Sequence, residues 1–214
     1  NLNSVCLVSS PAHFSRLVKD NVYSKLASTF KLAISSGGPL LVETAEQLIE
    51  QMGFSPIEIL GSTETGGIGW RQRDKKRLDV PWEAFNCVSL SEDSETQRLK
   101  IKSEYIPSDS WFVTDDRVQL LSERSFKLLG RTDRIVKIEE KRVSLDQVQL
   151  CLKKHSLIED VYCMTVVRER GIQIAAVIVL NDAGNQFLGS NKKFKLNRLL
   201  QMTLRNELEA IAIP

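Results

Sequence analysis

Residues 61–66, GSTETG, place three hydroxyl groups and one carboxylate between glycines, directly after a short apolar run. Hydroxyl groups donate hydrogen bonds to phosphate oxygens, a carboxylate can hold Mg²⁺, and glycines let the backbone approach a ligand. Ligands of open α/β sheets bind beyond the carboxyl ends of the strands. The segment therefore predicts a phosphate site, with Ser62, Thr63 and Thr65 as donors and Glu64 as the metal ligand. Taken alone, it also fits an ordinary polar turn with a solvated glutamate.

The other residues that could take part in binding or catalysis form less specific patterns. The basic run at residues 71–77, RQRDKKR, could contact a phosphate-bearing ligand, but a solvated loop is the favoured explanation. The cysteines at positions 6, 87, 151 and 163 are widely spaced and form no CxxC pair. This spacing is typical of buried thiols in a reducing cytoplasm rather than of disulfides or a zinc site.

The composition is that of a globular protein. The chain has 214 residues, of which 42% are hydrophobic and 26% charged, and its net charge is +2. This balance argues against nucleic acid or an anionic membrane as a partner, and no apolar run is long enough to span a bilayer. The chain opens at Asn1 with neither a methionine nor a secretory signal, so we expect a fragment of a cytoplasmic protein.

The first part of the chain alternates strands with helices. Apolar runs at Val5 to Val8, Leu32 to Ile34 and Ile57 to Leu60 predict buried strands. Helical spacing covers Ala12 to Phe30 and Leu41 to Met52 between them. Strands and helices in this order predict a parallel βαβ segment that ends at the GSTETG motif.

The pattern changes after this segment. From Ile68 to Leu129 the apolar runs are short and alternate with period two, which predicts an antiparallel, barrel-like segment. Among these runs are Phe85 to Leu90 and Val118 to Leu121. The natural boundary between domains follows at Gly130 to Asp133.

The remainder predicts a small α+β domain. It contains a hairpin over Ile135 to Val143, a helix capped by Ser144, strands over Val161 to Val167 and Ile172 to Leu180, and a closing helix over Phe194 to Ile211. The fold class is thus α/β: a parallel βαβ segment, an antiparallel barrel-like segment, and a small C-terminal domain. The predicted domains are residues 1–130 and 131–214.

Several motifs follow one another in a fixed order. They are Ser36-Gly37-Gly38-Pro39-Leu40, the GSTETG segment, Thr114-Asp115-Asp116, Gly130-Arg131-Thr132-Asp133 and the hairpin over residues 137–143. Together they resemble the AMP-forming adenylating superfamily of acyl- and aryl-CoA synthetases, luciferases and peptide-synthetase adenylation domains. The resemblance covers essentially the whole chain: the C-terminal part of the large AMP-binding domain and most of the small mobile domain.

The resemblance implies a role for each matching position. The cofactor-binding residues would be Gly37, Gly38 and Pro39 at the adenine, Gly61, Ser62 and Thr63 at the phosphates, and Asp116 and Arg131 at the ribose. The catalytic residues would be Thr63 at the α-phosphate, Glu64 on Mg²⁺, and Arg142 approaching the phosphates. Asp133 would be the hinge about which the small domain rotates. Taken without the resemblance, Arg142 could equally be a strand-face arginine paired with Glu139 or Glu140.

The sequence departs from the family pattern at three places. Leu60 stands where the family has an aromatic residue that stacks on adenine. Glu140 stands where the family has a hairpin glycine that admits the pantetheine arm, which puts free CoA as acceptor in doubt. The family's phosphate loop is expected upstream of Asn1, and its catalytic lysine is expected beyond Pro214, so we expect a truncated piece of the enzyme.

The resemblance therefore implies a fragment of an AMP-forming ligase. The parent protein would use ATP and Mg²⁺ to activate a carboxylic acid of fatty acid or aryl acid metabolism as an acyl-adenylate. It would then transfer the acyl group to CoA or to the phosphopantetheine of a carrier protein. The isolated fragment is expected to be inactive. The alternative is a non-catalytic nucleotide-binding or structural remnant.

Overall fold

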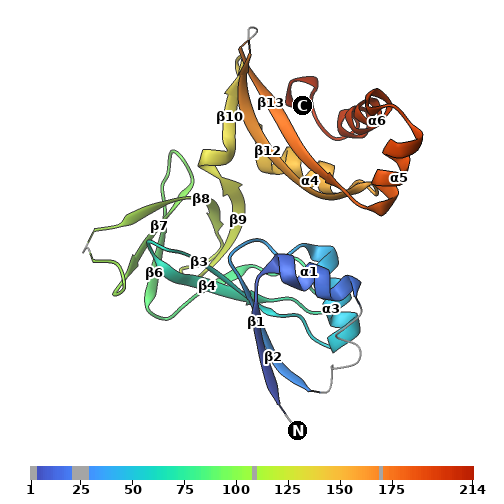
Figure 1. The fold of residues 1–214 in the computed structure, drawn as a ribbon. Helices are drawn as coiled ribbons and strands as arrows, with labels where there is room; N and C mark the ends of the chain where they lie inside the picture. Colours follow the sequence, from blue (N-terminus) through green and yellow to red (C-terminus); the bar gives the residue numbers. More distant parts are fainter. Residues whose placement is uncertain (1–3, 21–28, 108–109, 169–170) are drawn as a thin grey trace. The chain divides into compact units, whose positions relative to one another are not determined.

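The computed structural model describes residues 4–20, 29–107, 110–168 and 171–214. The chain divides into two compact units, Asn1–Leu129 and Gly130–Pro214 (Figure 1). Buried side chains form separate clusters, two in the first unit and one in the second. Each unit thus has its own hydrophobic core, as expected of a separately packed domain.

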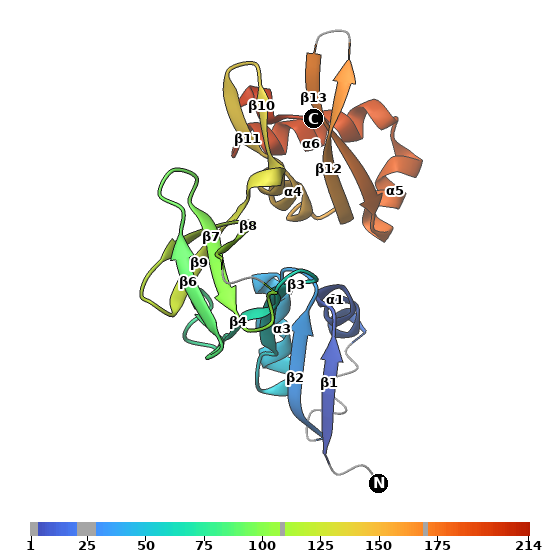
Figure 2. The ribbon, with the colours of Figure 1, turned by 90° about the vertical axis from the view of Figure 1, so that its left-hand side faces the viewer.

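The first unit opens with parallel strands crossed by helices. Its elements here are β1 (Val5–Ser9), α1 (Pro11–Lys19), β2 (Phe30–Ser36), α3 (Val42–Met52) and β3 (Ile57–Ser62). β2 pairs in parallel with both β1 and β3. α1 and α3 pack together along these strands (Figures 1 and 2), around the fully buried Phe14, Ala45 and Leu48. The predicted parallel βαβ segment is confirmed.

The predicted helix over Ala12 to Phe30 is too long. α1 ends at Lys19, and residues 21–28 lie outside the described part of the chain. Phe30 is the first residue of β2, where its half-buried ring packs against the same cluster as Phe14 and Val18. Phe30 fits the helical spacing because it faces that shared core, although it does so from a strand.

From β3 onward the strands pair antiparallel. The nine-stranded sheet has the order β1–β2–β3–β4–β5–β9–β8–β7–β6. The additional strands are β4 (Gly66–Gln72), β5 (Trp82–Ala84), β6 (Val88–Glu92), β7 (Arg98–Ser103), β8 (Phe112–Leu120) and β9 (Ser125–Arg131). The predicted strand over Phe85 to Leu90 begins only at Val88, because the Val88 amide donates to the Phe85 carbonyl in a turn. The antiparallel segment is otherwise confirmed.

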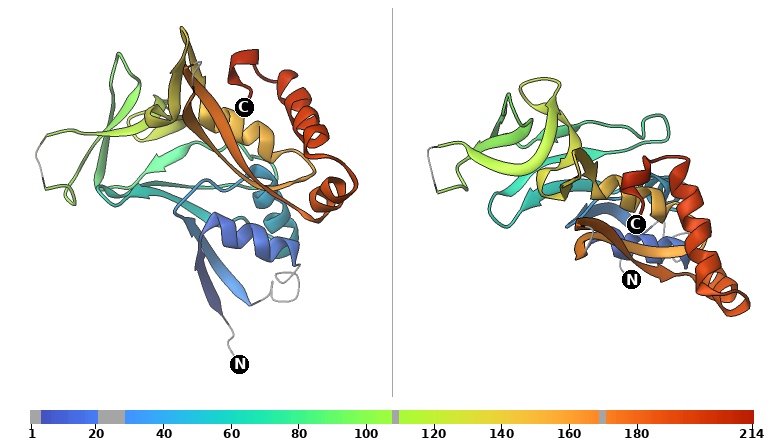
Figure 3. Two further views of the ribbon diagram at one scale, coloured as in Figure 1. Left: turned by 45° about the horizontal axis from the view of Figure 1, so that its top comes forward. Right: turned by 90° about the horizontal axis from the view of Figure 1, so that it is seen from above.

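The second unit packs helices on one side of a long hairpin (Figures 2 and 3). Its elements are the 3₁₀ turn η1 (Thr132–Arg134), β10 (Ile135–Ile138), β11 (Lys141–Ser144), α4 (Leu145–Lys153), β12 (Ile158–Arg168), β13 (Gly171–Leu180), α5 (Asp182–Ser190), α6 (Lys193–Arg205) and the 3₁₀ turn η2 (Ala210–Ala212). The predicted cap of α4 is present, since the Gln147 amide donates to Ser144 Oγ at 3.3 Å.

The end of this unit differs from the prediction. α5 was not predicted, because Gly184 and Gly189 interrupt its helical pattern. Its start is fixed by Asn181, whose Oδ1 accepts from the Gly184 amide at 2.9 Å. The helix predicted to reach Ile211 ends at Arg205, and Leu208 packs on the core from the turn that follows.

The cysteines divide between the units. Cys151 and Cys163 are buried in the second unit, and burial raises the pKa of each thiol to about 11. Cys6 is exposed and Cys87 is partly buried, so only two of the four predicted buried thiols are buried.

Among the described residues, no helix is both long enough and apolar enough to cross a bilayer.

Candidate active site

The GSTETG segment forms the tip of the β3–β4 hairpin. Thr63 and Glu64 lie in the turn itself and are exposed. Thr65 is 1% exposed, and its hydroxyl oxygen lies 3.2 Å from the Ser62 amide and 3.0 Å from Ser62 Oγ. The prediction that Thr65 donates to a phosphate is therefore wrong, because its hydroxyl holds the turn together. Thr63 and Glu64 remain the side chains that the turn presents.

The glycines at both ends of this turn have steric reasons. A Cβ at Gly61 would lie 2.4 Å from the Gly66 carbonyl oxygen, since a register shift between Leu60 and Gly61 brings the strands close together. Gly66 has a φ of 65°, which favours glycine. The turn conformation that exposes Thr63 and Glu64 therefore requires glycine at positions 61 and 66.

The Gly37–Pro39 turn lies at the same edge of the sheet. It follows the last residue of β2, Ser36, which pairs with Ile59 of β3 and donates its hydroxyl to the Ile59 carbonyl at 3.1 Å. Gly37 has a φ of 85°, and all three residues of the turn are exposed. Two of the predicted nucleotide-contacting segments therefore follow the carboxyl ends of the neighbouring parallel strands β2 and β3.

Asp116 lies on a bulge of β8. Arg98 pairs with Arg117 and Lys100 pairs with Val113, so the single residue between them on β7 faces residues 114–116 on β8. Bulges of this kind redirect side chains and often occur beside functional sites. The bulge separates Asp116 from the regular alternation of the strand.

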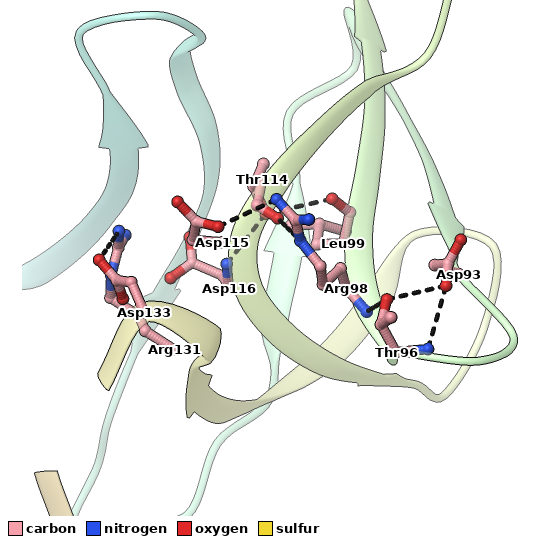
Figure 4. Close-up of polar contacts among 9 residues, drawn as sticks. All are labelled: Asp93, Thr96, Arg98, Leu99, Thr114, Asp115, Asp116, Arg131 and Asp133. Carbon is pink, nitrogen blue, oxygen red and sulfur yellow. Dashed lines mark hydrogen bonds and ion pairs between the residues drawn. The ribbon is translucent and has the colours of Figure 1, made fainter. Parts of the chain in front are cut away.

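Hydrogen bonds fix the bulge (Figure 4). Thr114 Oγ1 donates to the Leu99 carbonyl at 3.1 Å, and the Asp116 amide donates to Thr114 Oγ1 at 3.2 Å. Arg98 Nη2 donates to Asp115 Oδ1 at 2.9 Å, and its Nε donates to the Thr114 carbonyl at 2.7 Å. The first aspartate of the pair is therefore engaged by Arg98.

In the second unit, Arg131, the predicted ribose-binding residue, forms an ion pair with Asp133, the predicted hinge residue. Arg131 donates to Asp133 through Nε and Nη2, both at 2.9 Å, in a bidentate fork (Figure 4). The hydrogen bonds from Arg131 are the main cause that lowers the pKa of the Asp133 carboxyl. Both side chains are about half exposed, 45% and 48%. A ribose contact by Arg131 would compete with this fork.

Arg142 lies on the β10–β11 hairpin, opposite Lys137. Lys137 Nζ bonds Glu140 at 2.8 Å, and no ion pair of the described residues joins Arg142 to Glu139 or Glu140. Arg142 is exposed and lines a cavity of about 460 Å³ with Gln147 and Glu207. The structure therefore leaves its guanidinium at a surface hollow rather than in a local pair.

A magnesium role for Glu64 fits the donor set. The described residues contain no group of three or more histidine, cysteine, aspartate or glutamate side chains that could hold a metal ion. Mg²⁺ in nucleotide sites is commonly held by one or two carboxylates together with substrate phosphates. A single exposed carboxylate beside a phosphate turn meets that requirement.

Comparison with known proteins adds two findings about sequence. No family model matches the chain. The 4-coumarate–CoA ligase of Cereibacter sphaeroides is 27% identical over 158 residues, 72% of this chain and 33% of that protein. The indigoidine synthase of Streptomyces lavendulae is 26% identical over 157 residues, 72% of this chain and 10% of that protein.

A solved structure shows that the fold is similar as well. The structure of ATP-bound MatB from Rhodopseudomonas palustris matches with a TM-score of 0.78 at 18% identity, covering 98% of this chain and 46% of MatB. Sequence and fold together indicate the AMP-forming acyl- and aryl-CoA synthetase superfamily. The chain spans about half the length of the solved member and a third or less of these curated relatives of the superfamily.

One polar cluster of the first unit was not predicted. Arg71 and Arg73 belong to the run expected to be a solvated loop, but both pair with the buried Glu58 of β3. Gln72 and the later part of that run, Asp74 to Arg77, are exposed. Period-two spacing was the available signal, because residues 71 and 73 lie on one face of a strand and Glu58 interrupts an apolar run.

Proposed function

We propose that the chain is the nucleotide-contacting segment of an ATP-dependent acid–thiol ligase. The observation that supports this is that the Gly37–Pro39 turn and the Thr63–Glu64 tip follow the carboxyl ends of the adjacent parallel strands β2 and β3. Both turns expose backbone or hydroxyl donors where a nucleotide would lie. Similarity to a CoA ligase and to an ATP-bound synthetase supports the same assignment.

Binding of ATP or AMP would use the positions named above. Gly37, Gly38 and Pro39 would line the adenine, and the apolar Leu60 would take the place of a stacking ring. Asp116 would accept hydrogen bonds from the ribose hydroxyls, and Arg131 would donate a hydrogen bond to the ribose. Because Arg131 forms a fork with Asp133 in this structure, ribose binding would release the Asp133 carboxylate.

The first half-reaction would form an acyl-adenylate. The substrate carboxylate attacks the α-phosphorus, the bond to pyrophosphate breaks, and pyrophosphate leaves. Thr63 would donate to an α-phosphate oxygen, and Gly61 and Ser62 would shape the turn around it. Glu64 would hold Mg²⁺, which offsets negative charge on the phosphates when bound.

The second half-reaction would transfer the acyl group. The thiol of CoA or of a carrier-protein phosphopantetheine attacks the acyl carbon, and AMP leaves. Rotation about Asp133 would bring the β10–β11 hairpin to the site for this step. Glu140 would then stand beside the thiol arm, which favours a carrier protein over free CoA. The buried thiols Cys151 and Cys163 agree with a reducing, cytoplasmic setting.

Carboxylate-dependent exchange of pyrophosphate into ATP tests the proposal. We expect a longer protein that contains these residues to catalyse exchange, and the 214-residue chain alone to be inactive. Absence of exchange with a panel of aliphatic and aromatic acids would instead favour a non-catalytic nucleotide-binding remnant. Robust exchange by the 214-residue chain would contradict the expectation that it is an incomplete enzyme.

A further inference from the structure

A cluster of buried charges lies beneath the Gly37–Pro39 turn. Glu58 of β3 is 3% exposed, and Arg73, which follows β4, is 5% exposed. Arg71 Nη2 donates to Glu58 Oε2 at 2.8 Å, and Arg73 Nε lies 3.2 Å from Glu58 Oε1. The Arg71 guanidinium also stacks over the buried ring of Trp82 at 4.4 Å. One carboxylate thus faces two cations inside the first unit.

This arrangement is costly for a fold to maintain. Buried charges lose their hydration, and well-packed apolar residues often serve stability as well or better. Burial lowers the pKa of the Arg73 guanidinium, and the nearby Glu58 charge opposes that shift. The contact between Arg73 Nε and Glu58 is an ion pair without good hydrogen-bond alignment. A role besides stability would account for a second buried arginine at this carboxylate.

Arg73 also forms a hydrogen bond with Leu40, the residue that follows the Gly37–Pro39 turn. Arg73 Nη1 donates to the carbonyl of Leu40 at 3.1 Å, across 33 positions of the chain. Leu40 directly follows the turn and is 3% exposed. A Cβ at Gly37 would meet nothing within 4 Å, and one at Gly38 would meet only Pro11 Cγ at 3.9 Å, so these two glycines have little packing around them. Its conformation depends on the residues at either side.

The two sides of the turn are tied to the same hairpin. Before the turn, Ser36 Oγ donates to the Ile59 carbonyl of β3. After the turn, Leu40 is held by Arg73, which follows β4. The β3–β4 hairpin also carries Thr63 and Glu64 at its tip. Two side-chain hydrogen bonds therefore fix the predicted adenine loop to the element that carries the predicted phosphate turn.

We propose that Arg73, oriented by Glu58, is a positioning residue that holds the Gly37–Leu40 loop in its nucleotide-binding conformation. The proposal rests on the function proposed above only for the identity of the ligand. The restraint on the loop is a property of the first unit itself. Arg73 would act through Leu40 and would touch neither nucleotide nor acid.

The test compares three variants. Arg73→Met keeps the length of the apolar stem and removes the hydrogen bond to Leu40. Arg73→Lys keeps the charge beside Glu58, but its single ammonium cannot serve both Glu58 and Leu40 as the guanidinium does. Arg77→Met is the matched control, because Arg77 has a side chain 77% exposed and its ion pair within the described part of the chain is with the exposed Asp74.

Hydrogen exchange of the 214-residue chain gives the first measurement. We expect Arg73→Met and Arg73→Lys to speed exchange of the Ala45 amide, which donates to the Leu41 carbonyl directly after the loop, by about tenfold or more, with Arg77→Met unchanged. The Lys variant keeps the ion pair, so it is the one to use if Arg73→Met does not fold. Unchanged exchange in a folded Arg73→Lys would overturn the proposal.

The second measurement uses pyrophosphate exchange by the longer protein. Loosening of a binding loop removes binding that ground state and transition state share, so KM for ATP should rise about tenfold while kcat changes little. A variant that merely unfolds in part would lose kcat at constant KM, and that result would overturn the proposal. Faster loop exchange in a protein that binds no ATP would leave the restraint intact and refute the proposed function instead.

Discussion

Glu64 is the carboxylate that the β3–β4 tip presents, and its charge is the property to test. Glu64→Gln should reduce Mg²⁺-dependent adenylation by the longer protein about 100-fold or more, because the amide keeps the shape but loses the charge that holds the cation. The melting temperature should stay within experimental error, since Glu64 is an exposed turn residue. Pyrophosphate exchange at varied Mg²⁺ measures the effect.

Glu95→Gln is a suitable control for this change. Glu95 is an exposed glutamate in the turn of another hairpin, between β6 and β7. It should leave exchange unaltered. Equal exchange rates in Glu64→Gln and wild type would reduce Glu64 to a solvated turn residue.

Gly61 gives a prediction about stability. Gly61→Ala should lower the free energy of unfolding by about 2 kcal/mol, because its Cβ would meet backbone atoms of Gly66 that have no room to move. Gly189 of α5 has open space around it, so Gly189→Ala should stabilise the chain by roughly 0.5–1 kcal/mol. Urea unfolding of the two variants checks both signs. A stable Gly61→Ala variant would show that the tip is more plastic than described.

Asp133 gives a prediction about pH. Its pKa is lowered in the folded state, so the fork with Arg131 contributes stability that is present above the unfolded pKa and lost as pH falls through the folded pKa. Asp133→Asn should therefore be less stable than wild type at pH 7, and the difference should shrink below about pH 4. The effect should be small and should weaken in 1 M salt, because both side chains are half exposed. A difference that is constant with pH and salt would rule out an electrostatic role.

At the scale of elements, the β10–β11 hairpin carries the departure from the family pattern. The turn residue with a left-handed φ is Glu139, at 51°, whereas Glu140 has its side chain 90% exposed and bonds Lys137. Glu140→Gly should improve the use of free CoA in thioester formation several-fold and leave adenylation unchanged. Single-turnover rates of the two half-reactions, with Glu139→Gly as the matched variant, make the test. Equal CoA use in Glu140→Gly and wild type would show that Glu140 does not restrict access of the thiol arm.

The sequence was most informative where function depends on neighbouring residues. The GSTETG tip, the Gly37–Pro39 turn and the Ser144 cap are each set by local chemistry, and the structure forms all three elements. The order of strands and helices was enough to predict the parallel βαβ segment that ends at the GSTETG tip. The fork between Arg131 and Asp133 was not predicted, although the two residues lie only two positions apart in their motif.

Features that depend on long-range contacts were the ones missed. Glu58 and Arg73 meet only when β3 and β4 pair, so the basic run looked like a loop in solvent. Residues 114–116 form a bulge because of the register of β7, which no local pattern encodes. Phe30 and Leu208 kept helical spacing outside helices, since burial against a shared core sets apolar spacing whatever the backbone does.

At the scale of the whole molecule, the division at Leu129 and Gly130 bears on the predicted hinge. Asp133→Pro fixes φ at residue 133, removes its amide donor and restricts Thr132 before it. In the longer protein, adenylation should survive this change while thioester formation falls about tenfold or more, because only the second step is proposed to need rotation. Rapid-quench measurement of each half-reaction distinguishes the two. Equal loss of both would reject the hinge assignment.

The placement of the thiols makes that rotation visible to a fluorescent probe. Maleimides react with thiolates, and with a pKa near 11 only roughly one in three thousand of the Cys151 and Cys163 side chains is ionised at pH 7.5. Cys6 on β1 is exposed, so in a Cys87→Ser background a dye attaches to the first unit alone. The anisotropy decay of that dye then reports how independently the first unit tumbles. Asp133→Pro should lengthen the decay, with wild type carrying the same label as the reference.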